Sequence, residues 1–275
     1  MESSVYHIQS LALRPFVQYV LFNYAKKSTS EQRVTSLPNS NFCLGITKGK
    51  ELCKTEKGLV FRPKEGLGTY LSGLYTEPHV FCCTDELDEI CIDFTLAGYH
   101  RFFVTPPSTY LFSEDLLLPN FGPQAETFFE HLFCIEDRYV RGLGVEQFLL
   151  FRMRTNVREV PAYLHVFTSC TPLCTVSSLA GKLQYSERKL QRLCAKELAV
   201  SPKQLLRILR FRSLLDVLGN CVEGNNINWE ILAYDNGYFD YSHLHRDFQQ
   251  LTGRSPVVFS KDSRKIDATV TVCLE

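Results

Sequence analysis

Hydrophobic and polar positions follow different periods in different parts of the chain. Up to about residue 120, apolar residues occur in short runs that proline, glycine and asparagine separate. In the run 89–94, Ile90, Ile92 and Phe94 share one side and Asp93 lies on the other, which predicts a half-buried strand. Similar runs at 42–46 and 59–61 make an antiparallel barrel or sandwich the expected fold of residues 1–120. Residues 11–24 fit either a helix or a strand.

From about residue 121 the apolar period becomes helical. Apolar residues recur at every third or fourth position through 125–133, 145–153 and 160–167, and Gly142 and Gly144 interrupt the pattern. We therefore expect a small helical layer, for contact between subunits or for bridging to the next domain. The predicted class is α+β. We expect domains at 1–167 (β-rich to 120, helical from 121) and 175–262, a linker at 168–174 and a tail at 263–275. Residues 266–273 have the pattern of a strand.

The segment 175–262 contains the same local plan twice. In the first copy a short helix ends near Leu183, and Ser186 is the expected N-cap of a second helix over 187–196. In the second copy a short helix begins near Trp229, Gly237 permits a turn, and Asp240 is the expected N-cap of a helix over 241–251. Residues 202–218 are predicted to form one long connecting helix. This arrangement predicts two helix-turn-helix units.

The second helix of each copy has one apolar face and one polar face. Leu190, Leu193 and Cys194 are expected to face inward in the first copy, as are Leu244, Phe248 and Leu251 in the second. The residues expected on or beside the exposed faces, and hence to bind DNA, are Arg188, Lys189, Gln191, Arg192 and Lys196 in the first copy, and Tyr241, Ser242, His243, His245 and Arg246 in the second. Such a helix fits the major groove, where Arg pairs with guanine and Gln with adenine, while Lys binds phosphate. The two histidines are two positions apart, so they lie on different helix faces and do not predict a metal site.

Charge is unevenly distributed although the net charge is +0. Residues 1–175 have a balance of −3, residues 176–214 a balance of +7, and residues 215–262 a balance of −4. A compact +7 segment is expected of a surface that binds phosphates, and a merely solvated helical face is the alternative. Arg207, Arg210 and Arg212 of the connecting helix also suit phosphates or acidic partners.

The composition, 45% hydrophobic and 22% charged, is that of a globular protein. We find neither an apolar run long enough to span a membrane nor a secretory signal, and expect a cytoplasmic protein with reduced thiols that makes no use of a membrane. The 11 cysteines lack the spacing of a zinc site. Most are expected to be small apolar fillers, and the first candidate for redox sensing is the Cys170–Cys174 pair.

The second copy, with weaker support from the first, resembles the DNA-binding domain of the AraC/XylS family. The resemblance rests on Leu232-Ala233, Gly237-Tyr238-Phe239-Asp240-Tyr241-Ser242-His243, Arg246-Asp247-Phe248, Thr252-Gly253-Arg254-Ser255-Pro256 and Phe259, and upstream on Leu179-Ala180, Ser186, Leu190, Arg192, Ser201-Pro202 and Arg210. It covers about ninety residues. It implies a DNA-binding domain of seven helices and a separate regulatory domain, often a cupin-like β barrel followed by helices. By position, Arg188, Gln191 and Arg192 would reach base edges from the first unit, and Tyr241, Ser242, His243, His245 and Arg246 from the second.

The first copy departs from the family pattern at three positions. Ala199 stands where the family usually has Gly after the first recognition helix, Cys194 replaces an aromatic residue, and Leu214 replaces a small residue of the connecting helix. These departures bear on the packing of the first unit and leave its basic face unchanged.

The predicted function is sequence-specific regulation of transcription by binding of double-stranded DNA. The expected partners are double-stranded DNA, RNA polymerase, a small-molecule effector of the N-terminal domain and a second copy in a homodimer. We expect no catalytic residues, metal or cofactor. The rival hypothesis is a cupin-like enzyme or protein-interaction module with vestigial DNA binding, which the −4 balance favours.

Within the rival hypothesis, His79, Cys82, Cys83, Asp85 and Glu86 are the candidate metal ligands. An aromatic effector pocket would draw on Tyr70, Tyr75, Phe81 and Phe94. For each of these aromatic residues singly, an ordinary place in the core is the better prediction.

Overall fold

The computed structural model describes residues 1–27, 32–56, 58–104, 110–113, 115–155, 158–220, 227–262, 264–265 and 271–274. The chain forms two compact units. The first unit contains Met1–Arg33, Asn41–Gly73 and Phe81–Thr168, and the second contains Val34–Ser40, Leu74–Val80 and Ser169–Glu275. Two short pieces of the N-terminal half thus belong to the C-terminal unit.

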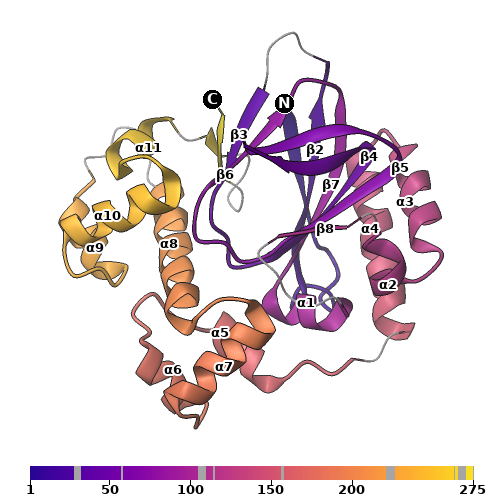
Figure 1. Cartoon of the computed structure of the whole chain (residues 1–275). Coiled ribbons are helices and arrows are strands. Elements are labelled where there is room, and N and C mark those ends of the chain that lie inside the picture. Colours follow the sequence, from indigo (N-terminus) through magenta and orange to yellow (C-terminus); the bar gives the residue numbers. More distant parts are fainter. Residues whose placement is uncertain are drawn as a thin grey trace. The chain divides into compact units, whose positions relative to one another are not determined.

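The first unit is built on a curled sheet that forms a half-barrel (Figure 1). Its main strands follow the order β1-β2-β7-β4-β5, all antiparallel, and β8 pairs with the end of β5. Residues 81–82 of β6 pair in parallel with residues 59–60 of β5. The strands are β1 (Glu2–His7), β2 (Val17–Ala25), β4 (Phe42–Thr55), β5 (Gly58–Ser72), β6 (His79–Cys83), β7 (Leu87–Phe94) and β8 (Tyr110–Ser113). The ambiguous segment 11–24 resolves into turns followed by strand β2.

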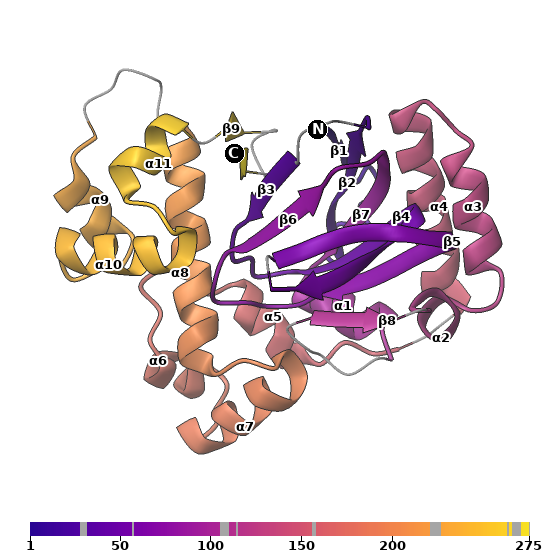
Figure 2. The same ribbon diagram turned by 45° about the horizontal axis from the view of Figure 1, so that its top comes forward.

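In the described part of the first unit, five helices accompany this sheet: α1 (Leu96–Phe102), α2 (Leu117–Phe121), α3 (Ala125–Phe133), α4 (Arg138–Thr155) and α5 (Ala162–Thr168). Figures 1 and 2 both show α2, α3 and α4 along one side of the sheet. The core between these layers is aromatic, with Phe94 packed edge-on against Phe103 and Phe121 in contact with Phe148. The α+β class and the helical layer after residue 121 are confirmed. No helix among the described residues is both long and apolar enough to cross a bilayer.

Strand β7 corrects the expectation of a half-buried strand. Ile90, Ile92 and Phe94 are buried as predicted, but Glu89 and Asp93 on the opposite face are buried as well, at 3% and 4% exposure. The alternating pattern identifies the strand correctly, but it does not report that the sheet curls and encloses its second face. Polar residues on that face are therefore inside the protein.

Glu89 is the centre of a buried polar network on the enclosed face. Its carboxylate accepts hydrogen bonds from Asn23 Nδ2 at 2.7 Å and from the Tyr70 hydroxyl at 2.8 Å. Burial raises the pKa of the Glu89 carboxyl above its ordinary value, although the two hydrogen bonds act in the opposite direction. The network therefore ties β2, β5 and β7 together through a carboxyl whose pKa is raised by burial.

We expect Glu89→Ala to destabilise the first unit by about 2–4 kcal/mol, because two buried donors lose their acceptor. In the native protein the folded-state pKa of Glu89 exceeds its unfolded value. Its stabilising contribution is therefore present at low pH and is lost as the pH rises through the folded pKa. Urea unfolding between about pH 4 and pH 8 should show this loss in the native chain and not in Glu89→Gln. Equal pH slopes for the two proteins would contradict the assignment.

The second unit is helical. It contains α6 (Val176–Lys182), α7 (Glu187–Leu198), α8 (Pro202–Asn220), α9 (Trp229–Asp235), α10 (Tyr241–Thr252) and α11 (Pro256–Asp262). Figures 1 and 2 show α6 and α7 at one end of α8, and α9, α10 and α11 at the other. The described part of this unit thus has six helices where the family resemblance implies seven, and the preceding helix α5 clusters with the first unit.

The described residues of the second unit also include the strands β3 (Gln32–Ser36, from Val34 onward), β9 (Arg264–Lys265) and β10 (Thr271–Leu274), and the first two residues of β6. Strand β10 pairs antiparallel with β9, and also with β3 through Val34 and Thr35. The predicted C-terminal strand is therefore present over 271–274, and its docking place is β3. Residues 266–270 of that prediction lie outside the described residues.

Candidate DNA-binding site

The first helix-turn-helix unit is set by local capping. Thr175 begins α6 with a reciprocal capping box, in which its side chain and that of Ser178 each accept from the other's backbone N–H. Ser186 begins α7, and its hydroxyl accepts a hydrogen bond from the Lys189 N–H at 3.2 Å. Between them the chain turns with Gln184 at φ 55°. Hydroxyl side chains at these two positions therefore fix where both helices start.

Helix α7 buries one face and exposes the other. Leu190, Cys194 and Leu198 are buried, whereas Leu193, which was expected to face inward, is half-buried. The five predicted DNA-binding residues of this helix are all exposed: Arg188, Lys189, Gln191, Arg192 and Lys196. The predicted polar face is thus assembled on one helix surface.

The cations of this face differ in how they are held. Lys189 Nζ lies 3.4 Å from the centre of the Tyr185 ring, and Lys196 Nζ lies 3.2 Å from a carboxylate oxygen of Glu197. Within the described part of the chain, the side chains of Arg188 and Arg192 form neither a hydrogen bond nor an ion pair. The two arginines are therefore available to an external ligand without first breaking an internal contact.

The second helix-turn-helix unit repeats this construction with different caps. Asn228 begins α9 by accepting from the Ile231 N–H at 3.1 Å, and Asp240 begins α10 by accepting from the His243 N–H at 2.6 Å. Gly237 occupies the turn at φ 74°. As predicted, α10 buries Leu244, Phe248 and Leu251.

The predicted DNA-binding residues of α10 fall into two groups. Ser242 and Arg246 are exposed, while Tyr241, His243 and His245 are half-buried. Tyr241 packs between Trp229 and His245, with ring centres 6.1 and 5.8 Å away. His243 Nδ1 accepts from the Phe239 N–H at 3.3 Å, and its ring lies 5.3 Å from that of Tyr238. His243 therefore takes part in the packing of the turn.

Helix α8 is joined to the second helix-turn-helix unit by a polar network. Arg207 forms an ion pair with Asp247 of α10 and donates to the Gln250 side chain at 2.7 Å. The Tyr238 hydroxyl donates to the other oxygen of Asp247 at 3.2 Å, and the Arg210 guanidinium lies 5.3 Å from the centre of the Tyr238 ring. Burial, reinforced by the charge of Asp247, raises the pKa of Tyr238, which keeps its hydroxyl protonated. Arg207 and Arg210 were expected to suit phosphates or acidic partners, and they hold the second helix-turn-helix unit together, Arg207 through the acidic Asp247.

The two recognition helices correspond position by position when they are aligned on their N-caps. Leu190 and Leu244 both stand four residues after the cap, and Cys194 and Phe248 both stand eight residues after it. Arg192 and Arg246 both stand six residues after the cap, and both are exposed. Sequence reasoning recognised the repeated plan but missed this common register, which counting from Ser186 and Asp240 would have shown.

Comparison with known proteins identifies this part of the chain. A family model described as a helix-turn-helix domain matches residues 179–262, from α6 to the end of α11. Residues 179–262 are a helix-turn-helix domain of the AraC type. Helix-turn-helix domains place their second helix in the major groove. The chain is therefore a DNA-binding protein of the transcription-regulator class.

Solved structures with some likeness to the chain include ToxT from Vibrio cholerae, at 11% identity and a TM-score of 0.47, over 88% of this chain and 97% of that one. Unsaturated fatty acid bound ToxT gives a TM-score of 0.43 at 11% identity, over 88% and 94%. The C-terminal domain of AraT, a response regulator from Geobacillus stearothermophilus, gives 0.31 at 22% identity, over 36% and 80%. These scores carry no conclusion about what this chain binds. No curated protein matches the sequence significantly.

Among the described residues of the AraC-type domain, two residues other than glycine adopt a left-handed backbone. Gln184 has φ 55° in the turn where the second unit has Gly237 at φ 74°, and Ala199 has φ 58° at the end of α7 where α10 ends at Gly253 with φ 75°. Left-handed backbone costs an L-residue roughly 1–2 kcal/mol, and glycine avoids that cost. The first helix-turn-helix unit therefore stores backbone strain that the second helix-turn-helix unit avoids.

We expect Ala199→Gly to stabilise the AraC-type domain by about 0.5–1 kcal/mol, and the reverse change Gly253→Ala to destabilise it by about 1 kcal/mol. A Cβ atom at Gly253 would meet nothing within 4 Å, so the second change tests the backbone alone. Thermal and urea unfolding of the full chain would measure both effects. Shifts of the same sign in the two variants would refute the argument from strain.

The thiols at positions 170, 174 and 194 do not resemble a redox sensor. No disulfide joins Cys170, Cys174 or Cys194 to another described cysteine, and burial raises the pKa of Cys170 and of Cys194 to about 12. Fast oxidation requires a thiolate, so both groups are poorly reactive at neutral pH. This favours apolar packing for Cys194, which is fully buried, over redox sensing by the Cys170–Cys174 pair.

The candidate metal ligands of the rival hypothesis do not converge on one site among the described residues. No group of three or more His, Cys, Asp or Glu side chains among the described residues has an arrangement that could hold a metal ion. Tyr70 and Phe81 lie near each other, with ring centres 6.4 Å apart, whereas Phe94 points to the opposite face of the sheet. Phe94 therefore does not share a pocket with Tyr70 and Phe81.

Proposed function

We propose that the chain is a sequence-specific regulator that reads double-stranded DNA with α7 and α10 in successive faces of the major groove. The observation that carries the proposal is the common register of the two helices, which exposes Arg192 and Arg246 at equivalent positions. A single rigid helix, α8, joins the two helix-turn-helix units. Such a connection is required if the two recognition helices are to read sites about one turn of the DNA helix apart. One monomer would then recognise a long and asymmetric site.

The roles of the side chains follow from their chemistry and their internal contacts. We assign base contacts to Arg188, Gln191 and Arg192 in α7, and to Ser242 and Arg246 in α10, all of which are exposed. Lys189 and Lys196 would bind phosphates. Tyr241, His243 and His245 are packed along the edge of α10, so in this proposal they contact DNA only with the side they leave open.

The N-terminal unit is proposed to modulate this binding, by sensing a small molecule, by dimerising, or by both. A ligand shifts such an equilibrium only through its different affinities for the two states of the protein. RNA polymerase is the proposed downstream partner. These assignments rest on the organisation of the chain into two units.

The primary test is a gel shift of the full chain with DNA from upstream of its own gene. We expect specific binding that weakens steeply with salt, because each neutralised phosphate releases a counterion. Arg192→Ala should abolish specific binding, while Arg62→Ala, which removes the same charge from an exposed position on β5, should not. Equal affinity for random DNA at every salt concentration, or no binding at all, would favour the rival hypothesis.

The division of roles makes a separate prediction. Lys189→Ala and Lys196→Ala should weaken binding to all sequences alike and lower the salt slope by about one for each phosphate that is no longer neutralised. Arg192→Lys and Arg246→Lys should instead change the preferred base at one position, since lysine cannot form the bidentate pair, at a cost of about 1–3 kcal/mol. Affinity measured against a panel of single-base variants distinguishes the two effects. A uniform loss in all four proteins would show that the assignment is wrong.

A further inference from the structure

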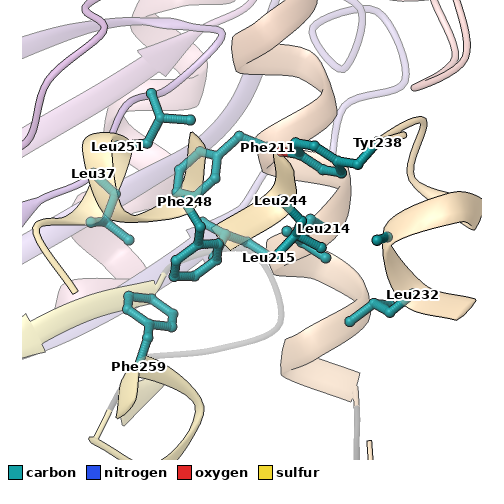
Figure 3. Packing of buried hydrophobic residues seen from close by; sticks show 11 residues of the cluster. Leu37, Phe211, Leu214, Leu215, Leu232, Tyr238, Leu244, Phe248, Leu251 and Phe259 are labelled. Atoms are coloured by element: carbon teal, nitrogen blue, oxygen red, sulfur yellow. The ribbon is translucent and has the colours of Figure 1, made fainter. Parts of the chain in front are cut away.

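A residue from the N-terminal half of the chain is part of the core of the second helix-turn-helix unit. Leu37, in the segment Val34–Ser40, is 3% exposed and belongs to the same hydrophobic cluster as Phe248, Leu251 and Phe259. Figure 3 shows the Leu37 side chain close to those of Phe248 and Phe259. Phe248 and Leu251 form the buried face of α10, so Leu37 supports the recognition helix from behind.

This segment is held in place on both sides of Leu37. The Tyr75 hydroxyl donates to the Leu37 carbonyl at 2.8 Å and is also hydrogen-bonded to the Ser36 hydroxyl. Tyr75 is 5% exposed and comes from the other N-terminal piece of this unit, Leu74–Val80. Upstream, Val34 and Thr35 pair with Leu274 and Cys273 of β10. The segment is thus bound by its side chain, its carbonyl and its strand pairing.

The same segment is covalently continuous with the first unit at both ends. Arg33 precedes it and Asn41 follows it, and both belong to the first unit. Strand β4 begins at Phe42, which is fully buried in the first unit. Asn41 comes only four positions after Leu37, so the backbone path by which a shift of the first unit would reach Leu37 is short.

We propose that residues 34–40 form a strap that completes the core behind α10 and makes the order of this recognition helix depend on the N-terminal unit. The regulatory part of the proposal rests on the proposed function, whereas the supporting role of Leu37 does not. Withdrawal of the strap would open a cavity beside Phe248 and Phe259 and loosen α10 and α11. Helix α7 buries a different set of residues and would keep its order. The device would thus switch one half of a two-part DNA site.

The first test is hydrogen exchange of the full chain carrying Leu37→Ala. Exchange in α10 and α11 should accelerate on the order of 100-fold, as expected for an emptied leucine site, while exchange in α7 stays within a few-fold of the native value. The matched control is Leu13→Ala, which removes an equally buried leucine from the first unit and should accelerate exchange there. Unchanged exchange in α10 and α11, or equal acceleration in α7, would overturn the proposal.

A milder substitution provides a second test that still applies if Leu37→Ala unfolds the whole protein. Tyr75→Phe keeps the buried ring and removes only the hydroxyl that holds the Leu37 carbonyl. It should produce the same pattern of faster exchange in α10 and α11, at roughly tenfold. If exchange in those helices is unaffected while the protein remains folded, the strap does not hold α10 and the proposal fails.

DNA footprinting separates the strap from the proposed function. With native protein protecting a two-part site, Leu37→Ala should lose protection over the part covered by α10 and retain it over the part covered by α7. Loss of both parts together, or of neither, would contradict the regulatory role. If native protein protects no DNA, the proposed function and the regulatory role fail together, and the exchange experiments still decide whether Leu37 supports α10.

Discussion

The ion pair between Arg207 and Asp247 is the interaction on which the geometry of the second helix-turn-helix unit depends. Asp247 lies on α10 and Arg207 on α8, so the pair joins the recognition helix to the connector, and both side chains are largely buried. Removal of one member of a buried pair costs about 3–5 kcal/mol, because the remaining charge loses its partner. Tyr238 and Gln250 supply the hydrogen bonds that such a buried pair requires. The orientation of α10 is therefore set by directional contacts as well as by apolar packing.

The two recognition helices share a register but differ in how firmly they are supported. Behind α10, the fully buried rings of Phe211, Phe248 and Phe259 pack edge to face. Behind α7, the position equivalent to Phe248 is Cys194, a much smaller side chain, and the helix ends in a strained Ala199. The first helix-turn-helix unit thus combines the stronger positive charge with a smaller core. This supports a division in which α7 contributes electrostatic affinity and α10 contributes a fixed geometry.

What the sequence could predict was the part of the structure governed by short-range rules. Ser186, Asp240 and Gly253 act on backbone groups within three or four residues, so their positions locate the ends of α7 and α10 directly. The exposed face of α7 followed from the helical period alone. The left-handed backbone at Ala199 was also accessible, because the resemblance places a glycine there.

Features that depend on distant segments could not be predicted in this way. The alternation in β7 is compatible with a flat or a curled sheet, and only pairing with β2 and β4 decides that Glu89 and Asp93 are enclosed. Leu37 lies in a short segment between strands, and nothing near it in sequence indicates burial against Phe259. Arg207 has the same local pattern whether it faces phosphate or Asp247. In each case the deciding partner is far away in the sequence, as Asp247 is from Arg207 at a separation of 40 positions.

The net negative charge of residues 215–262 becomes a weaker objection to DNA binding once the contacts of its carboxylates are known. Asp247 is neutralised by Arg207, and Asp240 uses its carboxylate to cap α10. Glu230 lies on α9, where its carboxylate accepts from the Tyr241 N–H at 3.4 Å, at the positive end of the helix dipole. These three carboxylates stabilise the position of α10, and none of them is among the exposed residues of that helix that we expect to contact bases, Ser242 and Arg246. The net charge of a segment is therefore a poor guide to its DNA-facing surface when its acids serve as caps and ion-pair partners, because the field at the groove is set by the side chains that remain exposed.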